Sequence, residues 1–160
     1  MGFSVANDLI TNITAAAQAA TGPGVYVTDG FFVSSDGSDV LMIGVPDFDG
    51  GDGNAVSGEI DFATTGIDGS HHETGSIQCV AVSWNGDAPE VGVPTARAAV
   101  WDIAETMDTL CRVQGGTDPA FGVERALWTR LGAGFDFDQL PMELGNAAIL
   151  KFRIYYEGRP

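Results

Sequence analysis

The segment from Ala147 to Tyr156 constrains the fold of this chain more than any other. Its residues alternate, with Ala148, Leu150, Phe152, Ile154 and Tyr156 on one face and Ile149, Lys151, Arg153 and Tyr155 on the other. Alternation with a period of two indicates a β-strand. One apolar face opposite a charged face is typical of an antiparallel sheet that is covered by helices on one side. An α+β fold is therefore expected.

Two segments have the apolar spacing of amphipathic helices. The first runs from Ser4 to Ala20. The second runs from Thr95 to Arg112, and we expect it to begin after Pro94 and to end before Gly115-Gly116. Its apolar stripe consists of Val100, Ile103, Ala104, Met107, Leu110 and Cys111.

Further strands are expected between these helices and after the second one. A turn-rich segment at 34–39 separates Val25–Val33 from Val40–Val45, which predicts a hairpin. Gly75–Trp84 is apolar on both sides, as in a central strand. The remaining candidates are a short strand at Glu59–Phe62 and a strand at Val123–Leu131.

The expected architecture is a mostly antiparallel sheet of about four to six strands with two main helices packed on one face. At 160 residues the chain is expected to form a single domain, 1–160, with an acidic Gly/Asp loop at about 46–58. The apolar share of 44% is enough for a real core.

Charge is distributed very unevenly along the chain. Residues 1–96 contain thirteen acids and no Lys or Arg, whereas residues 97–160 contain nine acids and all seven bases, for a net charge of −15. Phosphate binding needs Lys and Arg, so this distribution argues against a protein that grips nucleic acid. One acidic flank and one mixed flank suit a repeating contact between unlike surfaces around a ring.

The Asp-rich segment 47–54 has the composition of a calcium loop. An EF-hand loop would need a ligand in place of Gly51, a glycine in place of Asp52 and a glutamate in place of Gly58. All three requirements fail, so we expect a plain acidic loop, with weak divalent binding as the alternative.

No other residue set has the spacing of a catalytic or metal site. His71, His72, Cys79 and Cys111 match no zinc pattern, and we expect the two cysteines to be reduced and in the core. No Gly-x-Ser-x-Gly elbow or phosphate loop is present. We therefore expect no enzyme activity, no cofactor and no resident metal. No apolar run approaches the ~20 residues of a membrane span.

The order of segments resembles a known family. Gly75 to Asp87 reads as a strand that ends in Asn-Gly-Asp, and Ala96-Arg97-Ala98-Ala99 then opens the long helix that ends at Leu110-Cys111-Arg112. After this helix come a further strand, then the segment Phe135–Gln139, and last the closing segment Ala147–Tyr156. This order is similar to that of the tail terminator proteins of long-tailed, non-contractile (siphovirus-type) bacteriophages, especially those of actinobacterial hosts.

The resemblance implies a structural virion protein. Terminators form a six-membered ring at the head-proximal end of the tail tube, stop tube growth and join the tail to the head connector. The implied partners are other copies of the chain, the tail tube protein and the head–tail connector proteins, and DNA passes through the lumen without specific binding. The implied location is the virion tail, after assembly in the host cytoplasm. The alternatives are a tail tube or head–tail joining ring subunit, or a small acidic ligand- or calcium-binding module.

Charge also suggests which residues form the ring contacts. Either Arg97 and Arg112 on the long helix, or a sheet face with Arg125, Arg130, Lys151 and Arg153, would contact an acidic face of the next subunit. Asp47, Asp49 and Asp52 would lie in a loop near the lumen or a partner surface.

Overall fold

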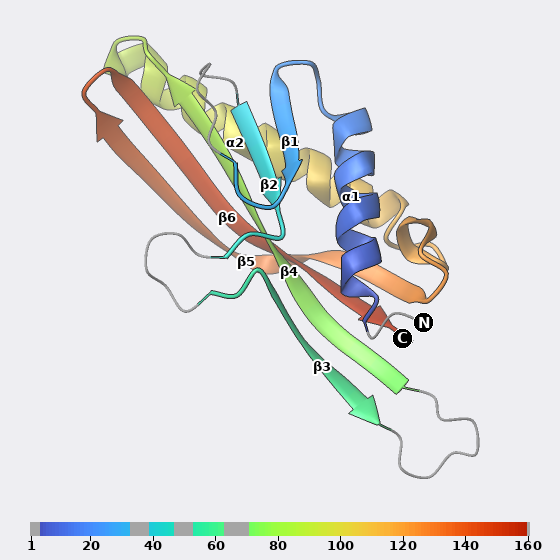
Figure 1. Cartoon of the computed structure of the whole chain (residues 1–160). Coiled ribbons are helices and arrows are strands. Elements are labelled where there is room, and N and C mark those ends of the chain that lie inside the picture. Colours follow the sequence, from blue (N-terminus) through green and yellow to red (C-terminus); the bar gives the residue numbers. More distant parts are fainter. Residues whose placement is uncertain (1–3, 33–38, 47–52, 63–70, 160) are drawn as a thin grey trace.

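The computed structural model describes residues 4–32, 39–46, 53–62 and 71–159 of the chain. Helices and strands follow one another along it in the order shown in Figure 1. Their bounds are α1 (Ala6–Ala20), β1 (Val25–Asp29), β2 (Asp39–Ile43), β3 (Val56–Phe62), β4 (His71–Asn85), α2 (Pro89–Val113), the short 3-10 helix η1 (Ala120–Gly122), β5 (Ala126–Met142) and β6 (Gly145–Gly158).

All six strands belong to one sheet, which confirms the expected α+β fold. The strand order is β1-β2-β4-β6-β5, and β3 pairs with the first half of β4 on the edge that β2 also uses. The β1–β2 pair is parallel and every other pair is antiparallel. β4 is therefore central, as its two-sided apolar sequence predicts.

One face of the sheet is covered by both helices. Leu9 and Ile13 of α1 and Met107 of α2 share a single buried cluster with Cys79 of β4 and Ile154 of β6. The whole predicted stripe of α2 is buried in this cluster, as are all five residues of the predicted apolar face of β6. Each large apolar side chain buried there stabilises the fold by about 1.5–3 kcal/mol.

No described helix covers the opposite face, which we call the helix-free face. Its apolar part is a small cluster of Val40, Met42, Val45 and Val80, with Val82 and Ile149 packed against it. Polar, charged and aromatic side chains line much of the rest of this face, and exposed apolar side chains lie at one end of it.

The hairpin predicted between Val25–Val33 and Val40–Val45 is wrong. Val25 pairs with Asp39 and Asp29 pairs with Ile43, so β1 and β2 run in the same direction. Gly30, at φ 84°, begins the connection and donates its N–H to the carbonyl of Ile43. Turn-forming residues show that a connection exists, but they do not fix whether it reverses the chain or returns it to a parallel start.

The predicted start of the long helix is also wrong. α2 begins at Pro89, six residues before Thr95, and Pro94 lies inside it. A proline at the first helical position costs nothing, because its missing N–H has no intrahelical partner there. Pro94 loses one hydrogen bond, which the helix tolerates so close to its start. This early turn packs closely, since a Cβ on Gly92 would lie 2.9 Å from Nδ2 of Asn146.

Several strands differ in extent from the sequence prediction: β1 ends at Asp29 instead of Val33, and β3 begins at Val56 instead of Glu59. β4 begins at His71 instead of Gly75. The strand predicted at Val123–Leu131 and the segment Phe135–Gln139 are one seventeen-residue strand, β5, with a shift in register between Leu131 and Phe135.

Candidate functional site

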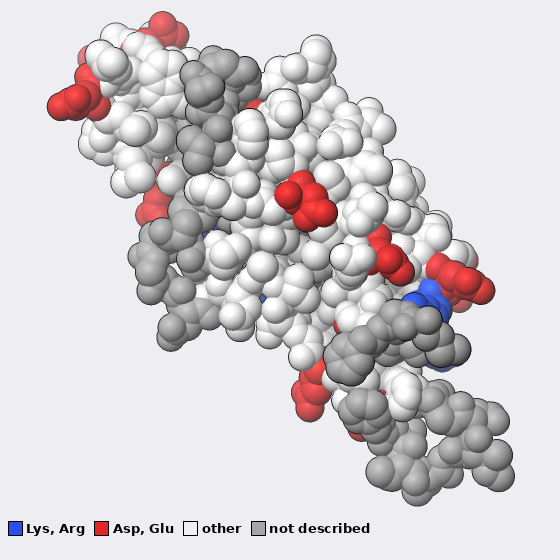
Figure 2. Space-filling model, in the orientation of Figure 1, with Lys and Arg blue, Asp and Glu red and all other residues white. Residues whose placement is uncertain are grey.

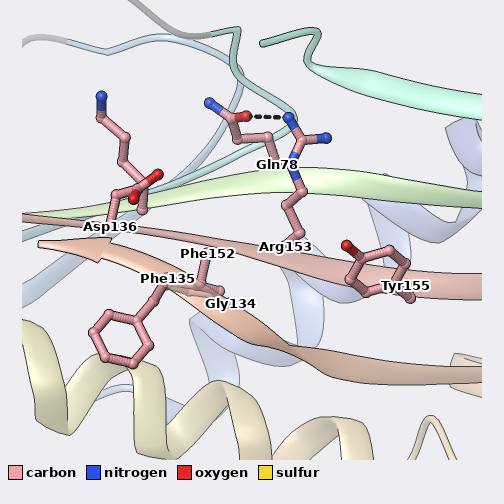
Figure 3. A pocket seen from close by; sticks show the side chains of 8 residues that line it. Gln78, Gly134, Phe135, Asp136, Phe152, Arg153 and Tyr155 are labelled. Atoms are coloured by element: carbon pink, nitrogen blue, oxygen red, sulfur yellow. Dashed lines mark hydrogen bonds between the residues drawn. The ribbon is translucent and has the colours of Figure 1, made fainter.

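The centre of the helix-free face is a shallow polar hollow of about 300 Å³ between β4, β6 and β5. The Arg153 side chain reaches back over β4 and its Nη2 donates to Gln78 Oε1 at 2.8 Å (Figure 3). Its Nη1 donates to Ser76 Oγ at 3.1 Å. Asp136 and Lys151 are cross-strand partners beside it. The hollow therefore holds two cations, a carboxylate and an amide.

A bulge in β5 makes room for this hollow. Leu131 pairs with Ile154 and Phe135 pairs with Phe152, so three residues of β5, 132–134, lie opposite Arg153 alone. A Cβ on Gly132 would come within 2.5 Å of the Tyr155 ring, so only glycine fits there. β-Bulges bend a strand and redirect its side chains, which is why they are common near functional sites.

One end of the helix-free face carries a cationic and aromatic surface, which we call the arginine patch: Trp128, Arg130 and Tyr155. The Arg130 guanidinium lies over the Trp128 ring, 5.1 Å from its centroid, in a cation–π contact. Trp128 Nε1 donates to Glu157 at 2.6 Å, and His72 Nε2 lies 2.7 Å from the other oxygen of Glu157. These hydrogen bonds, first that of His72, hold the pKa of Glu157 below its ordinary value of 4.5.

The other end carries an exposed apolar surface, which we call the tip patch: Trp84, Leu140, Met142 and Leu144. Trp84 of β4 and Leu140 of β5 lie on either side of Ala147 of β6 as cross-strand neighbours. Leu144 is 82% exposed in the two-residue turn between β5 and β6, and Met142 is 57% exposed. Such turns usually hold Asn, Asp or Gly, so an exposed leucine there calls for a reason outside the turn itself.

Charge differs between these two ends. The segments 84–91 and 138–147, which form the tip end, contain Asp87, Glu90, Asp138 and Glu143 and no Lys or Arg. In Figure 2 this end shows acidic atoms without basic ones, whereas the most prominent basic atoms in the view lie close to the chain termini marked in Figure 1.

The structure brings together part of the predicted basic sheet face. Arg130, Lys151 and Arg153 all lie on the helix-free face. Arg125 is in the turn before β5 and not on a strand, so that part of the prediction is wrong. The register shifts and turn at this point disturb the alternation on which the prediction depended.

The basic residues of the alternative contact, which was predicted on the long helix, do not lie on the sheet. Arg97 and Arg112 are exposed on α2, fifteen residues apart, which is about 22 Å along a helix. Arg112 forms an ion pair with Asp108 at 2.6 Å. Asp47, Asp49 and Asp52 lie outside the described residues.

The two cysteines are buried and free, as predicted. Burial raises the pKa of the Cys79 thiol well above its ordinary value, and it raises the pKa of Cys111 to about 11, with Asp108 adding to the effect. Both thiols are therefore protonated and unreactive at neutral pH. Within the described residues, no cluster of three or more His, Cys, Asp or Glu side chains is arranged to hold a metal ion.

Sequence reasoning missed a buried carboxylate. Glu73, 2% exposed, accepts hydrogen bonds from the Val5 N–H at 2.8 Å, from the Tyr156 hydroxyl at 2.8 Å and from Ser4 Oγ. Burial, together with the Glu73 carboxylate, raises the pKa of the Tyr156 phenol. The set ties the start of α1 to the sheet. Its signal in the sequence is that Glu73 lies four residues before Ile77 and therefore on the same strand face.

No family model matches this chain, and no curated protein is significantly similar to it. Among the described helices, none is both long and apolar enough to cross a membrane.

Proposed function

We propose that this chain is a structural virion protein, a tail terminator that forms a ring at the head-proximal end of a siphovirus-type tail tube. In this role it ends tube polymerisation and joins the tail to the head connector. The resemblance in segment order supports the proposal. So does the fold that the resemblance implies, an α+β subunit with its helices on one side of a mostly antiparallel sheet.

The observation that carries the proposal is the difference between the two ends of the helix-free face. A ring with cyclic symmetry joins unlike surfaces, so each subunit must present two of them. The arginine patch and the tip patch are two such surfaces on one subunit. Exposed apolar residues in a contiguous group usually mark a contact with another protein.

Disruption of the reading frame in the phage genome that encodes it tests this proposal. A terminator stops the tube at its proper length, so its loss is expected to give overlong tubes and unattached heads in electron micrographs. Complementation from a plasmid is expected to restore tails of uniform length.

The other outcomes identify the rivals. Loss of all tubes would assign the chain to the tube subunit, and normal-length tails without heads would assign it to a head–tail joining ring. Fully assembled virions would exclude all three structural roles and favour the ligand-binding alternative.

A further inference from the structure

We infer that neighbouring subunits join head to tail across the helix-free face, with the tip patch of one copy seated on the arginine patch of the next. The inference depends on the proposed function, because it names the surfaces through which the ring would close. Its occupant is a second copy of this chain.

The composition of the tip patch suits an interface. Four large apolar side chains are 40% to 82% exposed there, and they share one end of the sheet. Asp138 and Glu143, both exposed, flank them. An apolar centre with a charged rim is the usual anatomy of a specific protein contact.

The arginine patch has the complementary chemistry. Trp, Tyr and Arg are the residue types that dominate binding energy at protein interfaces. Arg130 is held in place by the Trp128 ring, so it loses little side-chain freedom when it binds a carboxylate. Tyr155 offers a flat apolar surface beside it, 41% exposed. A carboxylate such as Glu143 can pair with Arg130 while Leu144 or Met142 covers the aromatic rings.

The two patches lie far apart on the same strands. Arg130 pairs with Tyr155 and Leu140 pairs with Ala147, and these partners are eight residues apart on β6, which is about 26 Å. A subunit therefore cannot close this contact on itself. A two-fold dimer would form the contact twice between the same two copies, whereas a ring forms it once with each of two neighbours. The proposed function requires the ring, in which each copy uses its tip on one neighbour and its arginine patch on another.

The edges at β1 and β5 are less suited to this contact, because some of their backbone groups are bonded within the subunit. On β1 the carbonyl of Val27 accepts a hydrogen bond from Nε2 of Gln18 in α1, at 3.1 Å. On β5 the N–H of Thr129 donates to the carbonyl of Gly115, at 2.8 Å. Strand addition at either edge would have to break these bonds.

Two variants with opposite defects test the contact. The tip variant is Met142→Ser with Leu144→Ser, and the arginine variant is Arg130→Glu. Molar mass is measured by size-exclusion chromatography with light scattering over a concentration range, and folding is checked by circular dichroism. Wild type is expected to form closed oligomers, and each variant is expected to assemble tenfold or more weakly, on the order of the loss of one interface hot spot.

Mixing the variants gives the decisive measurement. The arginine variant keeps an intact tip, and the tip variant keeps an intact arginine patch, so one good contact can form between them. An equimolar mixture is expected to stop at a heterodimer, because the two outer surfaces of that dimer are both defective. A two-fold dimer would give the same heterodimer, but it would also limit the wild type to two subunits; a wild type that stops at a dimer would therefore overturn the ring contact.

Two control variants make the same kinds of substitution outside the two patches. Val113→Ser changes an apolar residue that is 64% exposed at the end of α2, and Arg97→Glu reverses an exposed arginine on α2. Both are expected to assemble like wild type. Wild-type assembly by the tip or arginine variant, a monomeric wild type at every concentration, or a mixture without heterodimer would overturn the contact. Tail length after gene disruption is independent of these results, so failure of the contact and failure of the proposed function can be told apart.

Discussion

The two faces of the sheet use the same strands and yet differ in what their side chains do. On β6, the residues that face the helices are all nearly inaccessible to solvent, whereas Lys151, Arg153 and Tyr155 on the other face remain partly or fully accessible. The helix-covered face therefore supplies most of the hydrophobic free energy of folding. The helix-free face contributes less to folding and is available for contacts with other molecules.

The division between the faces is kept across the larger irregularity of β5. The bulge in β5 opens the hollow beside Arg153, while Phe135 and Phe137 after the bulge still contact Trp101 of α2, with ring centroids 5.0 and 6.1 Å away. Because the register shifts by an even number of residues, each side chain stays on its own face. The bulge thus alters the helix-free face without exchanging the two faces.

Adjacent residues on β6 give the largest expected difference between the faces. Ile154→Ala is expected to lower the free energy of unfolding by about 2–5 kcal/mol, because it leaves a cavity in the main cluster. Tyr155→Ala is expected to cost about 1 kcal/mol or less, as a partly exposed residue does. Urea unfolding followed by tryptophan fluorescence measures both, and equal losses would contradict the division between faces.

A pair of tyrosines tests the same division with a single oxygen atom. Tyr156→Phe removes a hydrogen bond to the buried Glu73 carboxylate and is expected to cost about 1.5–3 kcal/mol. Tyr155→Phe, the matched control on the helix-free face, is expected to change stability by about 0.5 kcal/mol or less. The same urea titrations measure the difference, and a neutral Tyr156→Phe would show that Glu73 does not need this donor.

The parts of the fold that depend on local patterns could be predicted from the sequence. The alternation in β6 and the apolar stripe of α2 indicate which side of each element is buried, because the buried positions along the whole element are apolar. The burial of both faces of β4 could be predicted as well. Ile77, Cys79 and Ala81 belong to the main cluster, and Val80 belongs to the smaller one.

Features that depend on contacts between distant segments could not be predicted in this way. The parallel pairing of β1 with β2 and the continuity of β5 through Gly132–Gly134 are decided by neighbouring strands, while the local sequence there reads as a turn. The same holds for the site. The basic residues of the site could be identified from the distribution of charge along the sequence. The tip patch could not, because the exposure of Leu144 depends on the turn in which it lies.

The smallest expected effect concerns pH at the arginine patch. Glu157 accepts hydrogen bonds from His72 and Trp128, so the pKa of its carboxyl is lower in the folded chain than in the unfolded chain. A lowered pKa in the folded state adds stability that is fully present above the unfolded value of about 4.5 and is lost as pH falls through the folded value. The difference in melting temperature between wild type and Glu157→Gln is therefore expected to shrink as pH falls below about 4.5. Circular dichroism melts between about pH 3.5 and 7 measure it, with Glu124→Gln, at an exposed carboxylate before β5, as the control that should show no such trend. A difference that grows as pH falls below about 4.5 would mean that Glu157 is destabilising when charged, and that the contacts of the helix-free face at this end cost folding energy instead of adding to it.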